Sequence, residues 1–239
     1  MDDREKQYEE FYTVCKGCVK CRLRAGATQV VPGAGNPKSE IMFIGEAPGK
    51  QEDIQGLPFV GASGKFLNEM LASIGLKRED VYIANMIKCR PPENRDPQPD
   101  ELEICADWIT QQLEIIQPKI IVTLGRFGMA RFFGPKRKIS EIHGKVLYRE
   151  GRAHIALYHP AVALYNGGMR AQLLHDFKVI KLILDKYHTD PEYFALKAEK
   201  NEDAVDENTA FIKEAKKVNQ QADKNEPANN EPQDQPGLF

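Results

Sequence analysis

The chain has 239 residues, of which 41% are hydrophobic and 28% are charged, and its formal net charge at pH 7 is −2. The length is enough for one large domain with its own core. No apolar run is long enough to cross a bilayer, and the charged N-terminus at 1–6 lacks the apolar segment of a signal peptide. These features exclude a membrane-spanning or secreted protein, so we expect a soluble, cytoplasmic protein with no membrane partner.

The charge is distributed unevenly along the chain. Residues 189–239 hold 6 basic and 12 acidic residues, a net charge of −6, whereas residues 1–188 hold 27 basic and 23 acidic residues, a net charge of +4. A mildly basic main part permits nucleic-acid binding without establishing it.

The first predicted element is a helix over residues 3–14, and a cysteine-rich segment follows it. Cys15, Cys18 and Cys21 form two overlapping C-x2-C pairs, the spacing at which two thiolates reach one metal centre. Neighbouring lysines and arginines favour the thiolate form. Five cysteines in an intracellular chain indicate a metal site or a reactive thiol rather than a set of disulfides.

The stretch 41–66 is the part of the chain most typical of a binding site. It begins with four apolar residues, 41–44, which predict a buried strand. A long loop with several glycines, an apolar patch and the acids Glu46, Glu52 and Asp53 follows. Ligands of open α/β sheets bind beyond the carboxyl ends of the strands, and long ordered loops in compact domains are usually functional. We therefore predict a site here, followed by an amphipathic helix over 64–75.

The second predicted strand, residues 81–87, is apolar except for Asn85. The Asn85 amide presents a donor and an acceptor side by side, which complements one edge of a nucleobase. The alternative is that Asn85 caps a neighbouring loop, and the sequence alone does not separate the two.

A proline-rich loop at 88–97 and a helix at 99–116 come next, and each carries one cysteine. Cys89 and Cys105 are spaced as C-x15-C, and we interpret them as the second half of a four-thiolate site. The alternative is that both are buried small hydrophobic side chains.

The remaining elements alternate between strand and helix. His159 directly follows the last strand and is fixed by Pro160, which favours a role in the site over a merely structural one. The alternation predicts an α/β fold whose mainly parallel sheet has four central strands and is covered on both faces. The predicted elements are a strand at 119–125, a helix at 126–133, a strand pair within 139–158 that turns at 150–151, and a helix at 170–187.

The composition changes after residue 188, where we place the end of the first domain, 1–188. We expect a helical extension over 189–217 and a disordered acidic tail over 218–239. The tail ends in Gln-Pro-Gly-Leu-Phe, and two apolar residues at the tip of a solvated tail suggest a short docking motif.

Two nucleotide-binding motifs fail on inspection. A phosphate loop built on Gly64 and Lys65 would need glycine at Phe59 and serine or threonine at Phe66. Gly33 and Gly35 precede a strand and lack the third glycine of a dinucleotide fingerprint. The sequence thus excludes a P-loop nucleoside triphosphatase and a Rossmann dinucleotide-binding protein.

Four motifs in order resemble the family 4, iron–sulfur uracil-DNA glycosylases over residues 15–188. They are G-E-A-P-G at 45–49, P-F-V-G at 58–61, N-M-I-K-C-R-P-P-E-N-R at 85–95 and H-P-A at 159–161. The resemblance implies a three-layer α/β/α sandwich and a monofunctional hydrolase. Such an enzyme removes uracil from single- or double-stranded DNA and leaves an abasic site, which begins base excision repair.

The resemblance also implies a 4Fe–4S cluster bound by Cys18, Cys21, Cys89 and Cys105, because the family's second cysteine lies eleven residues before the position of Pro32. Spacing alone equally allows Cys15 and Cys18 as the first pair, and four thiolates also suit zinc.

The resemblance assigns roles in the uracil pocket. Uracil flips out of the DNA, stacks on Phe59 and is read by Asn85, which rejects cytosine. His159 stabilises charge that develops on uracil O2. Ala47 and Pro48 line the pocket, as does Glu46, and Glu46 or the region of Gly49 excludes the methyl group of thymine.

The group that positions the attacking water is a separate prediction, because Ala47 stands where many relatives in the wider superfamily have an acid. We predict Glu52 with Asn94 across the pocket, and Glu46 as the second candidate. At the DNA, we predict Leu164 and Tyr165 as a wedge in the minor groove. We predict phosphate contacts by Lys65, Arg90, Arg95 and Arg170.

The terminal Gln235, Leu238 and Phe239 are similar to the Q-x-x-L-F peptides that bind bacterial sliding clamps. We therefore expect the tail to tether the protein to a sliding clamp. We also expect the protein to be a monomer and to be associated with the nucleoid of a prokaryotic cell.

Two other functions fit the motifs less well. A non-catalytic iron–sulfur module on the same fold would have damaged motifs, yet Glu46, Phe59, Asn85 and His159 are all present. A relative that traps the abasic sugar covalently would carry GEQPG and a histidine in the loop after the second strand, and this chain has neither.

Overall fold

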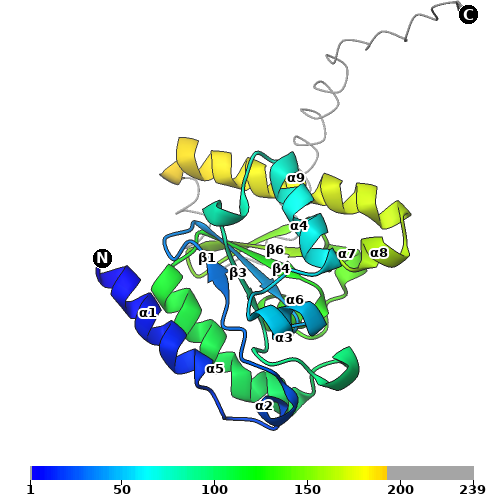
Figure 1. Cartoon of the computed structure of the whole chain (residues 1–239). Coiled ribbons are helices and arrows are strands. Elements are labelled where there is room, and N and C mark those ends of the chain that lie inside the picture. Colours follow the sequence, from blue (N-terminus) through cyan, green and yellow to red (C-terminus); the bar gives the residue numbers. More distant parts are fainter. Residues whose placement is uncertain (1, 193–239) are drawn as a thin grey trace, which may run out of the picture.

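The structure of the protein is a computed structural model, and it describes residues 2–192 (Figure 1). The predicted extension at 189–217 therefore lies outside the described residues except for its first four positions, and the predicted tail at 218–239 lies wholly outside them. Within residues 2–192, no helix combines the length and the apolar character that crossing a membrane requires.

A six-stranded sheet forms the centre of the molecule, with strand order β1-β3-β2-β4-β6-β5. Its four middle strands are parallel, which confirms the predicted parallel centre. One antiparallel strand at each edge widens it to six. The strands are β1 (Ala34–Gly35), β2 (Ile41–Gly45), β3 (Tyr82–Asn85), β4 (Ile120–Leu124), β5 (Val146–Arg149) and β6 (Arg152–Leu157).

The parallel strands are buried on both faces because helices cover the sheet from both sides. Every residue of β2 and β4 is buried, which explains why they appear in the sequence as nearly continuous apolar runs, interrupted in β4 by the buried Thr123. On one face lie α4 (Ala62–Ser73) and α9 (Gly168–Thr189), which enclose a core around Phe43 and Phe177. On the other lie α1 (Asp3–Lys16), α5 (Pro99–Ile116) and α6 (Arg126–Phe133).

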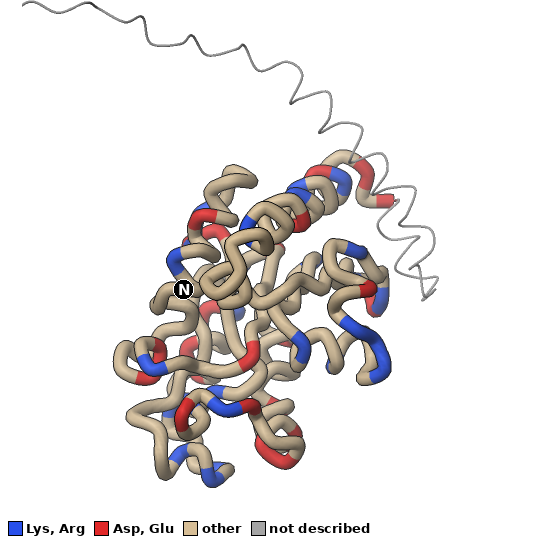
Figure 2. Tube along the Cα trace, turned by 90° about the vertical axis from the view of Figure 1, so that its right-hand side faces the viewer, with Lys and Arg blue, Asp and Glu red and all other residues tan. Residues whose placement is uncertain are grey.

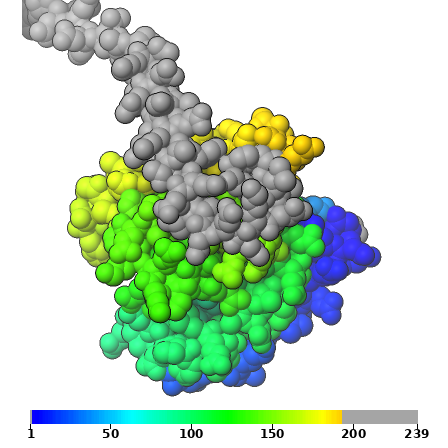
Figure 3. Space-filling model, turned by 180° about the vertical axis from the view of Figure 1, so that it is seen from behind, coloured from blue at the N-terminus to red at the C-terminus, as the bar shows by residue number. Residues whose placement is uncertain are grey.

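The figures show this three-layer arrangement directly. In Figure 1, α4 and α9 lie on one side of the sheet and α1 and α5 on the other. Seen from behind in Figure 3, α1 (blue) lies at one edge beside the green surface of the middle of the chain. Figure 2 shows acidic and basic positions interspersed along the described chain.

Several element boundaries differ from the predictions. The loop after β2 contains a short helix, α3 (Lys50–Gln55), and the following helix begins at Ala62. The second strand ends at Asn85, two residues early, and α9 begins at Gly168. Residues 139–142, predicted within the strand pair, form α7 (Ile139–Ile142) instead. The remaining short elements are α2 (Leu23–Gly26), α8 (Val162–Tyr165) and the 3-10 turns η1 (Arg78–Asp80) and η2 (Pro92–Asn94).

Candidate active site

A cavity of about 410 Å³ opens at the carboxyl ends of the parallel strands. Its walls come from the segments that follow β2, β3 and β6, as the position of the sequence motifs predicts. The structure brings together at this cavity most of the predicted pocket residues: Glu46, Ala47, Pro48, Glu52, Phe59, Asn85, Asn94 and His159.

Asn85 is the last residue of β3, and its side chain is only 2% exposed. Its Oδ1 has no hydrogen-bond partner among residues 2–192. Gly45 lies opposite in the register of β2, and a Cβ there would come within 2.4 Å of this oxygen. A buried polar atom without a partner is costly, so an acceptor held in this way at a cavity wall is typical of a ligand-binding position.

Phe59 forms another wall of the cavity, and its ring lies against the same glycine. A Cβ on Gly45 would come within 2.6 Å of the ring, so the absence of a side chain there makes room for Phe59. The ring stacks with that of His159, with centroids 5.5 Å apart and planes 27° apart. Phe59 is 4% exposed, and it lines the cavity.

His159 follows β6, and the backbone fixes its tautomer. The N–H of Ala161 donates to His159 Nδ1 at 3.2 Å, so in the neutral ring Nε2 carries the proton. Burial lowers the pKa of His159 to about 4, and the Glu52 carboxylate opposes this shift. The imidazole is therefore neutral near pH 7 and has an N–H to donate.

Glu46 is anchored where α6 begins. Its Oε1 accepts from the backbone N–H of Arg126 at 2.8 Å, and burial raises the pKa of its carboxyl group. Gly125 adopts a φ of 96°, and a Cβ there would lie 2.4 Å from the same oxygen. The site therefore requires glycine at this position for two separate reasons.

Glu52 and Asn94, the predicted water-positioning pair, both line the cavity. Glu52 is 8% exposed, and its Oε1 accepts from the backbone N–H groups of Val60 and Gly61 at 2.9 and 2.8 Å. Asn94 is exposed, and its Oδ1 accepts from Arg90 Nε at 2.8 Å. Glu52 thus anchors the loop that carries Phe59, a structural role that the sequence did not reveal.

The rim of the cavity carries exposed apolar side chains. Leu164 is 48% exposed and Tyr165 is 90% exposed, and both lie on the short helix α8 at the cavity edge. Lys65 is exposed on α4. Arg170 forms an ion pair with Glu69 and lies 4.4 Å above the ring of Phe66, so it is already bound within the protein.

Comparison with known proteins agrees with this geometry. The family model of the uracil DNA glycosylase superfamily matches residues 32–179. The type-4 uracil-DNA glycosylase of Archaeoglobus fulgidus is 53% identical over 171 residues, covering 68% of this chain and 86% of the relative. The type-4 enzyme of Sulfurisphaera tokodaii is 47% identical and covers 76% of this chain and 84% of its own length. That of Thermotoga maritima is 40% identical and covers 78% and 99%.

The chain belongs to the type-4 uracil-DNA glycosylases. The family assignment confirms the resemblance and the fold class that the sequence motifs predicted. The five cysteines do not line the pocket.

Four chain segments bring the five cysteines into one apolar cluster. Cys15, Cys89 and Cys105 are buried, and Cys18 and Cys21 are partly buried. Burial and the neighbouring thiols of Cys105, Cys21 and Cys18 raise the pKa of Cys89 to about 12. Among the described residues, no group of three or more His, Cys, Asp or Glu side chains is arranged to hold a single metal ion.

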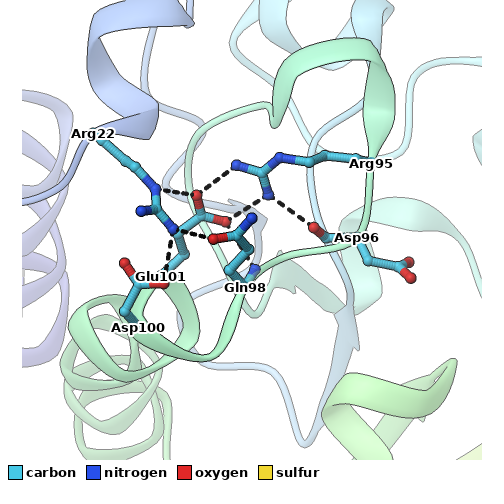
Figure 4. Close-up of polar contacts among 6 residues, drawn as sticks. All are labelled: Arg22, Arg95, Asp96, Gln98, Asp100 and Glu101. Atoms are coloured by element: carbon cyan, nitrogen blue, oxygen red, sulfur yellow. Dashed lines mark hydrogen bonds and ion pairs between the residues drawn. The ribbon is translucent and has the colours of Figure 1, made fainter.

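Arg95, a predicted phosphate contact, is instead bound to a buried carboxylate that the sequence analysis missed (Figure 4). Its Nη1 and Nη2 donate to the two oxygens of Glu101 at 2.9 and 2.7 Å, and Arg22 Nε donates to Oε1 at 2.9 Å. The N–H of Gln98 donates to Oε2 at 2.9 Å. The hydrogen bonds from Arg95 lower the pKa of Glu101 to about 2 despite its burial. We call Arg22, Arg95, Gln98 and Glu101 the Glu101 network.

Lys88 is a second buried charge that the sequence analysis did not single out. It is 1% exposed, and its Nζ donates to the backbone oxygen of Asn85 at 2.8 Å and to Gln112 Oε1 at 2.7 Å. Burial lowers the pKa of Lys88 to about 8. One feature of the sequence could have indicated this buried charge. Lys88 directly follows the predicted apolar strand and lies between Asn85 and Cys89, and a lysine buried there needs polar partners.

Proposed function

We propose that this chain is a monofunctional uracil-DNA glycosylase that hydrolyses the N-glycosidic bond of deoxyuridine in DNA. The observation that carries the proposal is that two groups line one cavity: Asn85 Oδ1, which has no hydrogen-bond partner among residues 2–192, and the neutral His159, whose Nε2 carries a proton to donate. The function agrees with the names of the relatives, which are type-4 uracil-DNA glycosylases.

The proposed reaction has two stages, recognition of the base and cleavage of its bond to the sugar. A nucleotide flipped out of the DNA places its base against the face of Phe59. Asn85 Oδ1 accepts the N3–H of uracil, and its amide nitrogen donates to O4. Cytosine presents an acceptor at N3 and a donor at C4, so it would leave both hydrogen bonds unmade.

Cleavage breaks the bond between C1′ of the sugar and N1 of uracil, and the electron pair leaves with the base. The negative charge spreads onto O2, where the Nε2–H of His159 donates to it. A water molecule adds its hydroxyl to C1′, and its remaining proton is released to the uracil anion or the solvent. We propose that Glu52, with Asn94 opposite, orients that water, and that Glu46 shapes the pocket wall.

The test of this function is an end-labelled oligonucleotide that contains one deoxyuridine. We expect hot alkali after incubation to break the strand at that position, with no break for a thymine control and none without alkali. A strand break before alkali would contradict a monofunctional enzyme. Full-length DNA after alkali, with the protein folded and bound to the oligonucleotide, would instead favour the non-catalytic module.

For the cysteines we propose a 4Fe–4S cluster bound by Cys18, Cys21, Cys89 and Cys105. The donor set fits, because the four proposed ligands lie in one apolar cluster, Cys89 and Cys105 buried and Cys18 and Cys21 partly buried. In a four-iron cluster each thiolate binds a different iron atom, so the sulfurs stand further apart than around one zinc. The cluster would supply redox-active iron next to the strand end that carries Asn85, and no step of the cleavage passes through it.

Iron and sulfide analysis of the purified protein tests this proposal. We expect about four of each per chain and a visible thiolate-to-iron absorption band that Cys89→Ser abolishes. Because Cys15 is buried in α1 and remains the alternative to Cys21 in the ligand set, Cys15→Ala is the matched control and should keep the band. Zinc in place of iron, or loss of the band in Cys15→Ala alone, would contradict the assignment.

We further propose that Leu164 and Tyr165, which are exposed at the cavity rim, enter the DNA as the base flips. We also propose that Lys65, which is exposed, and Arg90, which is half-buried, contact phosphates. The predicted contacts by Arg95 and Arg170 require these side chains to exchange their carboxylate partners for phosphate.

The C-terminal motif Gln235, Leu238 and Phe239 lies outside the described residues, and its role as a sliding-clamp ligand remains a proposal from the sequence. Deletion of 235–239 should abolish capture by an immobilised clamp and leave activity on short oligonucleotides intact. Equal capture of both forms would end the proposal.

A further inference from the structure

The backbone conformation of Phe59 needs an explanation. Its φ is 51°, in the left-handed region that residues with a Cβ adopt uncommonly. Such a conformation persists only where the surrounding structure fixes it. Groups around the turn that carries the Phe59 ring must therefore hold it in this conformation.

The carbonyl side of this turn is held by Arg78, from the 3-10 turn η1. Its Nη1 donates to the backbone oxygen of Phe59 at 3.0 Å, and its Nη2 donates to that of Pro58. A guanidinium group offers these donors in one rigid plane, so it can fix two successive carbonyl groups together. Nη1 also approaches Asn68 Oδ1 at 3.4 Å, which orients the guanidinium from α4.

The amide side of the same turn is held by Glu52. The carboxylate accepts from the N–H groups of Val60 and Gly61, the two residues after Phe59. The turn therefore lies between a cation on its carbonyl groups and an anion on its amide groups. The cation acts on Pro58 and on Phe59 itself, and the anion acts on the two residues that follow Phe59.

The surroundings leave the turn little room to relax. A Cβ on Gly64 would lie 1.9 Å from the Phe59 oxygen, so the first turn of α4 packs directly against that carbonyl group. On the other side, the ring lies against Gly45 and stacks with His159. A rotation of the peptide that follows Phe59 would therefore displace the ring from the cavity wall.

We infer that Arg78 is a positioning residue for base recognition, which acts by holding Phe59 in its left-handed conformation. Arg78 does not line the cavity, so it acts through the turn of Pro58 and Phe59 that it holds. The inference rests on the proposed function, because it assigns Phe59 to uracil. Nothing in the motifs that identify the family includes this arginine.

The test compares Arg78→Met and Arg78→Lys with the parent on the deoxyuridine oligonucleotide. Misplacement of a substrate-contacting group by about 1 Å can cost on the order of 100-fold, so we expect kcat/KM to fall by about tenfold or more in Arg78→Met. Lysine keeps the charge but not the planar fork, and Arg78→Lys should stay at least about threefold slower than the parent. Inhibition by free uracil should weaken in parallel, because product binding uses the same ring.

The matched control is Arg152→Met at the far end of β6, where Arg152 also donates to a backbone oxygen, that of Leu113 at 3.4 Å. We expect its kcat/KM to remain within about twofold of the parent. Melting temperature and the cluster absorption of all variants establish that they are folded. Should Arg78→Met fail to fold, Arg78→Lys carries the test.

A double-mutant cycle separates positioning from general structural damage. If Arg78 acts through Phe59, Arg78→Met costs little further activity in a Phe59→Ala background. An equal loss in both backgrounds would overturn the inference, and so would parent-like activity and uracil inhibition in Arg78→Met. Absence of cleavage by the parent protein would instead count against the proposed function, so the two failures are distinguishable.

Discussion

The Glu101 network and the cavity lined by Asn85 and His159 both contain buried polar groups, but the hydrogen bonding of these groups is opposite. The carboxylate of Glu101 is fully buried and accepts four hydrogen bonds, from Arg22, from both terminal nitrogens of Arg95 and from the Gln98 amide. In the pocket, Asn85 Oδ1 has no partner within the described chain, and His159 keeps an N–H for the cavity.

The difference separates groups that hold the fold from groups kept for a ligand. A satisfied buried network fixes local structure, whereas an unsatisfied buried acceptor costs about 1–3 kcal/mol, which a ligand that donates to it recovers. Substitutions in the Glu101 network should therefore lower stability, and substitutions in the pocket should lower activity without lowering stability.

The largest effect is expected at His159. Removal of one donor to a developing negative charge typically costs on the order of 10²–10³-fold in rate. His159→Ala should lower kcat by this factor while its melting temperature stays close to that of the parent. Single-turnover cleavage and thermal unfolding measure the two quantities. A large loss of melting temperature would show that His159 stabilises the fold, as the Glu101 network does, and would contradict the distinction between the two regions.

The opposite pattern is expected at Glu101. Its pKa of about 2 lies below the ordinary value of 4.5, so the ionised form contributes about 3 kcal/mol of stability that is fully present above pH 4.5. This contribution is lost as the pH falls from 4.5 towards 2. Glu101→Gln should remove a stability of this order at neutral pH and flatten the acid dependence, measured by urea unfolding.

Glu103→Gln, on the same helix but exposed, is the matched control for Glu101 and should change stability by less than about 0.5 kcal/mol. If the two variants unfold at the same urea concentration, the Glu101 network does not stabilise the fold.

Glu52 belongs to both classes, and a conservative substitution can separate its roles. A glutamine Oε1 can still accept from the N–H groups of Val60 and Gly61, so Glu52→Gln keeps the anchor and removes only the negative charge. We expect at least about tenfold slower cleavage with unchanged DNA affinity, a loss of about 1.4 kcal/mol in transition-state stabilisation. Near-normal single-turnover rates would show that Glu52 only anchors the loop.

The smallest effect at neutral pH concerns His154, a buried histidine that does not line the cavity. Burial between Phe132 and Phe133 lowers its pKa to about 4, so the unfolded chain binds one proton more between about pH 4 and 6.5. Stability is therefore lost as the pH falls through this range. His154→Gln should reduce the slope of unfolding free energy against pH by up to about 1.4 kcal/mol per pH unit. An unchanged slope would mean that another group takes up the proton.

The sequence predicted the parallel centre of the sheet because strands buried on both faces appear as nearly continuous apolar runs. It predicted the pocket because three of its walls are short motifs at strand ends. It missed α3, since the six residues Lys50–Gln55 are too few and too polar to show a periodic pattern.

Contacts between distant residues were beyond the reach of local patterns. Arg22 and Glu101 are 79 positions apart, and Arg78 meets the carbonyl groups of Pro58 and Phe59 some 20 positions away. The sequence predicts Arg95 as a phosphate contact because a basic residue in a loop near the pocket is typical of one, but it does not predict the Glu101 partner. The contact of Arg95 with Glu101 forms because α5 packs against the loop after β3, and a local sequence pattern does not predict that packing.

The Glu101 network also bears on how the protein matures. Arg22 is adjacent to Cys21, and Glu101 precedes Cys105 by about one helical turn, so contacts between protein groups alone join the segments that carry both cysteine pairs. Small zinc domains unfold without their metal, and their ligands meet only when it binds. If these cysteines bind the proposed cluster, the hydrogen bonds of Arg22 and Arg95 to Glu101 would hold the two ligand segments together independently of it.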